Sequence, residues 1–521
     1  MHEIELLLLA LILAVAGLSV LARMVRGPYP LLLVLGGLVL GFVPGMPAVE
    51  LPPELVLVAF LPPLLYWSGF FSSPRDLRTD ARTISLLAVG LVLATTVAVA
   101  VLAHAMVEGM TWPAAFALGA IVSPTDPLAA SAIGRRLGVP RRLLTVLEGE
   151  SLVNDATALT AYRVAVVAAA SGSFVLWQAG LRFVVMAAGG VVVGLLVGWL
   201  VAELRRRLDD PVVEIVVSVF TGYAAYLPAE LLGVSGVLAA VSAGLYVGWR
   251  APGLSSAATR LLGFSFWEVL VYLANAVLFI LVGLQLRPIL HDLDGTAVAV
   301  LVAQGALVSA VVIAVRLGWG FSIPYLVRLV DRRPSQVMRR VGARERLLIG
   351  WSGMRGAVSL AAALALPLDF PMRNLILFLT FSVILATLVA QGLTLPALIR
   401  RLRLEDDDSE EREELKGRLA ATHAALDRLD ELAGADWTRD DTVERLHAMY
   451  EFRRRRLKAR GGYLEDEGAE DRSQAYQRLL RELLEAQRQA IVRLRNQGHI
   501  SNDVMHRIER ELDLEDSRLE I

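Results

Sequence analysis

The chain has 521 residues, of which 55% are hydrophobic, and a formal net charge of −1. Soluble proteins contain about 45–50% apolar residues on average, so this composition, with a mean hydropathy of +0.55, argues against a soluble globular protein. Cysteine is absent, which excludes a disulfide framework and a cysteine-based metal site. The net charge averages two unlike parts, because the sequence is mostly apolar up to Arg403 and densely charged after Leu404.

Long apolar runs follow one another from Glu3 to about Arg403. A membrane-spanning helix needs about 20 mostly apolar residues, and the runs predict thirteen such helices. The first run lacks a positively charged start and a small-residue cleavage site, so we expect a retained helix rather than a signal peptide. The predicted spans are centred near residues 13, 36, 61, 94, 122, 157, 189, 220, 241, 275, 312, 355 and 385.

The distribution of arginines indicates how these spans are oriented. Arginines crowd the odd-numbered loops, such as Arg135 and Arg136 in the fifth, whereas the even-numbered loops hold only Arg287 and Arg373. Cytoplasmic loops of membrane proteins are rich in Lys and Arg. The sequence therefore predicts a multi-pass protein of the cell (inner) membrane, with its N-terminus outside and its C-terminal tail in the cytoplasm.

Two of the spans are interrupted by helix-breaking residues. The fifth reads "GAIVSPTDPLAASAIG", in which Pro124 and Pro127 bracket Thr125 and Asp126. The twelfth reads "IGWSGMRGAVSLAAALALP", in which three glycines surround Arg355. Each proline removes a backbone donor and disturbs the preceding turn, so we expect no continuous helix in the fifth span.

The two breaks occupy matching places if span seven is a linker. Spans one to six and eight to thirteen then form two halves that start on opposite sides of the membrane, each interrupted at its fifth helix. Such matched interruptions are typical of transporters with inverted repeats, and we favour this interpretation over two independently kinked helices. The predicted fold is an all-α polytopic membrane protein, with about thirteen transmembrane helices in two inverted six-helix repeats with crossed discontinuous helices (residues 1–403). A helical cytoplasmic tail follows (residues 404–521).

Span six carries an unusual polar stretch, "EGESLVNDA", at residues 148–156. Ser151 and Asp155 are four residues apart and share a helix face with Glu148, while Glu150 and Asn154 share the neighbouring face. Asp155 lies about 13 residues into the span, which is about 20 Å along the helix axis at 1.5 Å per residue. That depth places the carboxylate well within the bilayer.

An ionised carboxylate at this depth costs several kcal/mol, so we expect Asp155 to take up a proton or to hold a cation. Oxygen ligands from Asp155, Ser151 and the backbone near Thr125 suit a small monovalent cation such as Na⁺. The imidazoles and thiolates that transition metals prefer are missing from this stretch. One carboxylate that trades one monovalent cation for one proton moves no net charge, which predicts electroneutral 1:1 exchange.

Other charges in the spans have both structural and functional interpretations. Glu150 and Arg355 are predicted to form a structural ion pair, because each would be costly to bury alone. Glu148 either lines a cytoplasmic funnel or is solvated near it. Asp126 either binds the ion or holds the crossed half-helices by accepting from backbone donors and Asn154. Four further charges are pathway residues or, more commonly, members of structural pairs: Glu214, Glu230, Glu268 and Arg316.

The tail has the pattern of a separate soluble helical unit. An acidic linker, "EDDDSEEREE", leads to residues 476–495, whose leucines and isoleucine recur at three- and four-residue spacing. That spacing predicts an amphipathic helix that packs on a partner. The run "RRRR" (453–456) either contacts anionic lipid or, more commonly, forms a solvated face. We hypothesise that the tail supports dimerisation or regulation.

Three motifs and their order resemble the monovalent cation/proton antiporters of the NhaP and sodium/proton exchanger type. They are "SPTDP" (123–127), "GESLVND" (149–155) and "GMRGAVSLA" (353–361), accompanied by "LPPLL" (61–65) in span three. The resemblance covers essentially residues 1–403. It implies a homodimer in which a six-helix core with crossed broken helices moves like an elevator against a dimerisation domain, exchanging Na⁺ for H⁺.

The resemblance also assigns roles to individual residues. Asp155 matches the aspartate that binds ion and proton, Ser151 a side-chain ligand, and Thr125 a ligand through its backbone, so these three would hold Na⁺. Asp126 and Asn154 match polar groups that organise the crossing. Glu150 and Arg355 match an ion pair between spans six and twelve, and the Asn-Asp pair resembles the electroneutral branch.

One position departs from the family pattern. Many relatives carry an acidic residue shortly after the Pro-Pro of span three, whereas this chain has Tyr66, Trp67 and Ser68 there. K⁺ or Li⁺ is therefore an alternative to Na⁺. A cation channel is disfavoured because the chain offers one asymmetric site, and an enzyme because Ser151 has no suitably spaced base. The expected partners are these ions, protons and membrane lipid, with neither a cofactor nor a nucleic acid.

Overall fold

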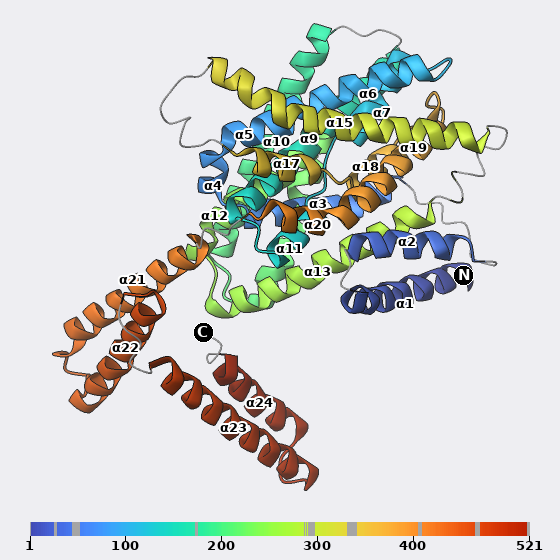
Figure 1. Cartoon of the computed structure of the whole chain (residues 1–521). Helices are drawn as coiled ribbons and strands as arrows, with labels where there is room; N and C mark the ends of the chain where they lie inside the picture. The colour runs from blue at the N-terminus through green and yellow to red at the C-terminus, as the bar shows by residue number, and fades with distance from the viewer. Residues whose placement is uncertain are drawn as a thin grey trace. The chain divides into compact units, whose positions relative to one another are not determined.

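The computed structural model describes residues 2–25, 29–43, 53–171, 176–285, 287, 289, 297–330, 341–404, 409–463 and 469–517. Every regular element within these ranges is a helix, as predicted (Figure 1). The chain divides into two compact units, Met1–Glu405 and Asp406–Ile521. Each unit is described by itself.

The regular elements described in the first unit are all helices. Its first part contains α1 (His2–Val25), α2 (Tyr29–Gly41), α3 (Pro53–Phe71), α4 (Pro74–Thr79), α5 (Ala81–Ser85), the π-helix η1 (Leu86–Leu91), α6 (Val92–Met106), α7 (Trp112–Val122), α8 (Leu128–Arg136) and α9 (Arg141–Ser171). Its second part contains α10 (Leu176–Arg205), α11 (Pro211–Leu231), α12 (Gly236–Arg250), the short η2 (Ala251–Gly253), α13 (Ala257–Leu284), α15 (Val298–Val330), α17 (Ala343–Trp351), α18 (Ala357–Leu364), α19 (Arg373–Ala386), the π-helix η3 (Thr387–Gln391) and α20 (Gly392–Leu402).

Six helical segments among the described residues are long and apolar enough to cross a membrane. They are Ala81–Met106, Gly180–Arg205, Pro211–Leu231, Ala257–Leu284, Val298–Val327 and Arg373–Leu402. Shorter apolar helices include segments of α1, α2, α3 and α7. Twelve of the thirteen predicted span centres fall on helices. The exception is residue 355, which lies between α17 and α18. The number of membrane crossings remains a prediction.

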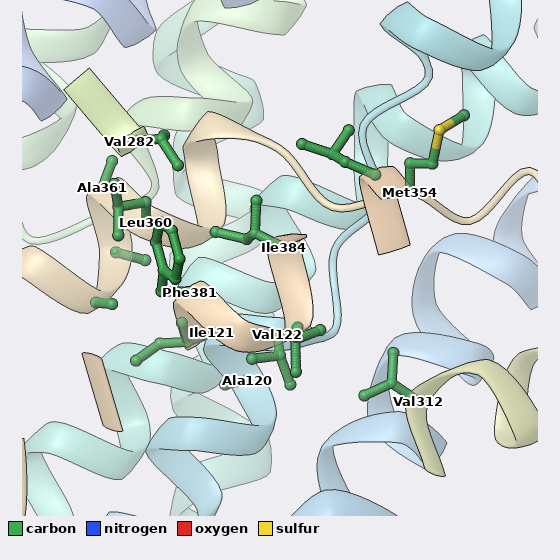
Figure 2. Close-up of a cluster of buried hydrophobic side chains, with 14 of the residues drawn as sticks. Ala120, Ile121, Val122, Val282, Val312, Met354, Leu360, Ala361, Phe381 and Ile384 are labelled. Carbon is green, nitrogen blue, oxygen red and sulfur yellow. The ribbon is translucent and has the colours of Figure 1, made fainter. Parts of the chain in front are cut away.

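Both predicted helix breaks are confirmed. The segment Ser123–Pro127 separates α7 from α8, and Ser352–Gly356 separates α17 from α18. The two breaks meet, because the backbone N–H of Asp126 donates to the carbonyl of Met354 at 2.8 Å. Buried apolar side chains, including Val122 and Phe381, surround the meeting point (Figure 2). The inverted repeat itself remains a prediction.

The helices of the first unit pack as two bundles. The first bundle contains α1, α2, α3 and α10 to α13, and the second contains α5 to α9, α15 and α17 to α20. Within the first bundle, α12 approaches α3 through Gly244 and Gly248, where an added Cβ would lie 2.3 Å from the carbonyl of Tyr66 and 2.1 Å from that of Phe70. Small residues at helix contacts let the backbones come close, so this seam is tightly packed.

The described residues of the second unit form four helices: α21 (Ser409–Leu432), α22 (Asp440–Arg460), α23 (Ala469–Asn496) and α24 (Asn502–Ser517). As predicted, residues 476–495 lie within a helix that has one buried apolar face. Leu484 and Ile491 of α23, seven residues apart, pack with residues of α24. The two helices also share an ion pair between Arg488 and Asp516 at 3.0 Å.

Candidate functional site

A cavity of about 880 Å³ lies between the two bundles. The first bundle contributes residues of α2, α3 and α13 to its wall, and the second contributes the α7–α8 break, α8, α9 and α18. At one end, exposed Arg135 and Glu148 form an ion pair at 2.6 Å, so we call this end the mouth. The polar residues of the wall are Tyr29, Ser68, Ser72, Thr125, Asp126, Ser131, Arg135, Glu148, Ser151, Asp155, Glu268, Asn275 and Ser359.

The structure brings four of the predicted ion-site residues together at this cavity: Thr125, Asp126, Ser151 and Asp155. Asp155 is 9% exposed, and Ser151 lies one helical turn before it on α9. The Asp155 carboxylate accepts no hydrogen bond and forms no ion pair among the described residues. Its oxygens are therefore free to bind a proton or a cation within the cavity.

Thr125 is held in place from α9. The amide of Asn154 donates to the Thr125 hydroxyl at 2.9 Å and to the Thr125 carbonyl at 3.3 Å. The same hydroxyl donates to Glu150 at 3.0 Å. A carbonyl oxygen has two lone pairs, so the Thr125 carbonyl retains one acceptor site for a cation. Asn154 is fully buried, and its bonds tie the α7–α8 break to α9.

Asp126 lies where two half-helices begin. Its carboxylate accepts from the backbone N–H of Leu128 at 2.9 Å, at the start of α8. An added Cβ on Gly356, the residue before α18, would lie 1.9 Å from Asp126 Oδ2, so the carboxylate also lies against the start of α18. Helix N-termini carry a partial positive charge that stabilises an anion. The expected bond from Asn154 goes to Thr125 instead of Asp126.

Arg355 lies where the other two half-helices end. Its Nε donates to the carbonyl of Val122, the last residue of α7, at 3.1 Å. Its Nη1 donates to the carbonyl of Gly353, just beyond α17. The final carbonyls of a helix lack intrahelical donors and carry a partial negative charge, which the guanidinium offsets. Asp126 and Arg355 thus balance opposite ends of the crossed half-helices.

The predicted pairing of Glu150 with Arg355 is wrong. Glu150 forms its ion pair with Arg316 of α15, whose Nη2 donates to Glu150 Oε2 at 2.9 Å and whose Nη1 donates to Oε1. Arg316 also donates to the carbonyl of Ile349 on α17. Glu150 and Arg316 are each 1% exposed. Arg355 instead donates through Nε and Nη1 to the carbonyls of the breaks.

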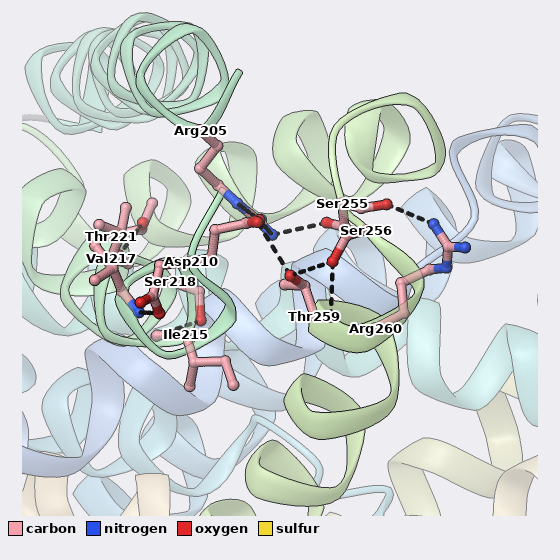
Figure 3. A network of polar contacts seen from close by, with 12 residues as sticks. Arg205, Asp210, Ile215, Val217, Ser218, Thr221, Ser255, Ser256, Thr259 and Arg260 are labelled. Atoms are coloured by element: carbon pink, nitrogen blue, oxygen red, sulfur yellow. Dashed lines mark hydrogen bonds and ion pairs between the residues drawn. The ribbon is translucent and has the colours of Figure 1, made fainter. Parts of the chain in front are cut away.

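The four charges whose roles the sequence left open are now distinguished. Glu214 pairs with Arg205 at 3.0 Å, within a network that includes Ser255 and Thr259 (Figure 3). Glu230 pairs with Arg163, connecting α11 to α9, and Arg316 pairs with Glu150. Glu268 has no such partner among the described residues, and it lines the cavity.

Sequence reasoning missed several polar residues of the cavity wall, which are Tyr29 of α2, Ser72 just after α3, Ser131 of α8, Asn275 of α13 and Ser359 of α18. A polar residue within an apolar run was the available signal, but many such residues only cap carbonyls of their own helix. Asn275 does this as well, donating to the carbonyl of Val271 at 2.8 Å. Among the described residues, no group of histidines, cysteines and carboxylates could hold a metal ion through three such ligands. The donor set of hydroxyl, carbonyl and a single carboxylate suits an alkali cation.

Comparisons with known proteins agree on one family. A family model described as "Sodium/hydrogen exchanger, transmembrane" matches residues 9–401. An uncharacterized Na⁺/H⁺ exchanger of Mycobacterium tuberculosis is 39% identical over 522 residues, covering 98% of this chain and 95% of that protein. The Bacillus subtilis protein named sodium, potassium, lithium and rubidium/H⁺ antiporter is 34% identical over 411 residues, covering 76% of this chain and 61% of that protein.

A solved structure shares the fold. The sodium proton antiporter MjNhaP1 from Methanocaldococcus jannaschii, at pH 8, matches with a TM-score of 0.59 and 22% sequence identity. The match covers 77% of this chain and 99% of that chain. The likeness supports the helical architecture of the first unit.

Proposed function

The chain belongs to the sodium/hydrogen exchanger family, and from this premise we propose that it exchanges Na⁺ for H⁺ across the cell membrane. Its named relatives are exchangers and antiporters, so the protein is a transporter and not an enzyme. The observation that carries the proposal is the cavity wall around Asp155. There, a carboxylate that has no partner among the residues the structure describes lies one turn from the Ser151 hydroxyl, on the same wall as Thr125.

Competition for Asp155 couples the two ions. The carboxylate binds one proton or, together with Ser151 and the Thr125 carbonyl, one cation. Either occupant neutralises the charge, and an unoccupied carboxylate at this depth costs several kcal/mol. The second bundle therefore moves readily across the membrane only when Asp155 holds a proton or a cation. Each cycle then exchanges one Na⁺ for one H⁺ without net charge movement. Asp126 organises the crossing and lies on the same cavity wall, where it adds negative potential for the cation.

Access to the site alternates by movement of the second bundle against the first. The cavity lies between the two bundles, and its mouth carries Arg135 and Glu148. The arginine distribution assigns this mouth to the cytoplasm. The ion pair of Arg163 with Glu230 joins the bundles away from the mouth, and it must separate during an elevator-like movement. We also propose that the protein is a homodimer, with its N-terminus outside and the second unit in the cytoplasm.

K⁺/H⁺ exchange is the second candidate. The Bacillus subtilis relative is named for sodium, potassium, lithium and rubidium, and span three of this chain lacks the acidic residue expected near Trp67. Ser68 lines the cavity at that place. A hydroxyl in place of a carboxylate makes the site less negative, which weakens the preference for the smaller, more strongly hydrated ion.

The test is transport in proteoliposomes with an imposed pH gradient, using Na⁺, K⁺ and Li⁺ in turn, with and without a membrane potential. We expect proton flux that depends on the added cation and does not change with the potential. Asp155→Asn should abolish this flux while leaving the thermal unfolding midpoint near that of the wild type. Cation-dependent proton flux that persists in Asp155→Asn would overturn the assignment.

A further inference from the structure

The first bundle contributes one carboxylate to the cavity, that of Glu268 on α13. Glu268 is exposed, and within the described residues it has neither an ion pair nor a hydrogen bond. At the mouth, Glu148 has its charge offset by Arg135 at 2.6 Å. No side chain in the described part of the chain offsets the charge of Glu268 in this way, so its negative potential acts on the cavity.

Glu268 of α13 and Glu148 of α9 each precede a buried polar residue of the cavity wall by seven positions. On α9, exposure falls over seven residues from half-buried Glu148 to Asp155, which is 9% exposed. On α13, it falls over seven residues from exposed Glu268 to Asn275, which is 5% exposed. Seven helical residues advance by about 10.5 Å. Each wall of the cavity therefore has a carboxylate near the mouth and a buried polar residue about two turns deeper.

The orientation of Glu268 is fixed by the residue before it. Trp267 is 4% exposed, donates to the hydroxyl of Ser218 at 2.9 Å, and stacks on Trp67 of α3 with ring centroids 5.3 Å apart. Successive helical residues differ by about 100° around the axis, so anchoring Trp267 inside the first bundle turns Glu268 to another face. That face borders the cavity.

We propose that Glu268 is the cation-recruiting residue of the cavity mouth, where it concentrates Na⁺ or K⁺ for transfer to Asp155. This rests on the proposed exchange function and adds a residue to it. A cleft lined by charge of one sign raises the local concentration of the opposite ion. Because Glu268 belongs to the first bundle and Asp155 to the second, Glu268 assists only from the side on which the mouth opens. Its contribution is to cation capture and not to the turnover step.

The test is the cation dependence of exchange in inside-out membrane vesicles, whose bath contacts the mouth side, for the wild type and Glu268→Gln. At an ionic strength of about 0.01 M, we expect the apparent KM for the cation to rise about three- to tenfold, with kcat unchanged. The difference should nearly vanish in about 1 M choline chloride, where the Debye length falls to about 3 Å. Right-side-out vesicles should show no change in KM, and Glu268→Asp should restore most of the affinity.

The matched control is Glu108→Gln. Glu108 is an exposed carboxylate between α6 and α7 and lies outside the cavity wall, so the KM of this variant should stay at the wild-type value. An unchanged KM in Glu268→Gln at low ionic strength would overturn the inference. So would a change that is independent of salt, or a fall in kcat alone, since either would indicate a structural role. Absence of exchange in the wild type would instead overturn the proposed function, and this inference with it.

Discussion

The carboxylate of Glu150 illustrates how a buried charge is stabilised in this protein. It accepts two hydrogen bonds from Arg316 and one from the hydroxyl of Thr125. The sequence indicated that Glu150 needs a cation, but it offered two buried arginines. The choice between Arg316 and Arg355 depends on the three-dimensional packing, because Arg316 is 166 residues away along the chain. No pattern of helical spacing could have identified it.

We expect Arg316→Ala to destabilise the protein by about 3–5 kcal/mol, because it leaves the Glu150 charge buried and unpaired. Adding Glu150→Gln should recover a large part of that loss. Arg355→Ala should also destabilise, through the unsatisfied carbonyls of Val122 and Gly353, but Glu150→Gln should not rescue it. Thermal or denaturant unfolding of the single and double variants measures this coupling. Equal rescue of both arginine variants would contradict the pairing.

At the scale of elements, the broken helices were the most predictable feature. Prolines at 124 and 127 and the glycines around Arg355 disrupt helices for local reasons, so the sequence alone located both breaks. The residues of α9 around Asp155 were equally predictable, because four-residue spacing fixes which side chains share a face. On α13, the sequence singled out Glu268 as a pathway candidate, whereas Asn275 was not predictable, because it becomes part of the site only through contacts between bundles.

The crossing of the half-helices requires a residue without a Cβ at position 356. A Cβ there would lie 1.9 Å from Asp126 Oδ2, and real atoms cannot approach so closely. We expect Gly356→Ala to push the Asp126 carboxylate away from the helix ends, lowering both the exchange rate and the thermal midpoint. Gly180→Ala on α10 is the matched control, because no atom lies within 4 Å of its added Cβ. Wild-type transport by Gly356→Ala would argue against a role for this contact.

At the scale of the whole transporter unit, function depends on relative movement of the two bundles. The all-helical architecture and the positions of the helices followed from apolar runs, whereas the grouping into bundles followed only from the structure. The seam between α3 and α12 is tightly packed, because glycines of α12 lie against backbone carbonyls of α3. The bundles make fewer close backbone contacts with each other, and the cavity separates them in part.

A cross-link between the bundles should therefore stop exchange. The chain has no cysteine, so Arg163→Cys with Glu230→Cys introduces the only two thiols. Bridging them with a short reducible reagent is expected to abolish cation-dependent proton flux, and reduction should restore it. The control is Asp80→Cys with Arg142→Cys. These two residues form an ion pair at 2.9 Å within the second bundle, so bridging them should leave exchange intact. Undiminished flux in the bridged Arg163/Glu230 variant would argue against movement between bundles.

The two bonds that Asn154 donates to Thr125 limit how the transport stoichiometry can be altered. Adding a second acidic group beside Asp155 would be the simplest way to make each cycle electrogenic. An aspartate at 154 has no N–H to offer, so it would face the Thr125 hydroxyl and carbonyl as an acceptor and would stand close to the Glu150 charge. A change in stoichiometry at this position thus requires a new donor for Thr125 at the same time, and a single substitution would disable the exchanger.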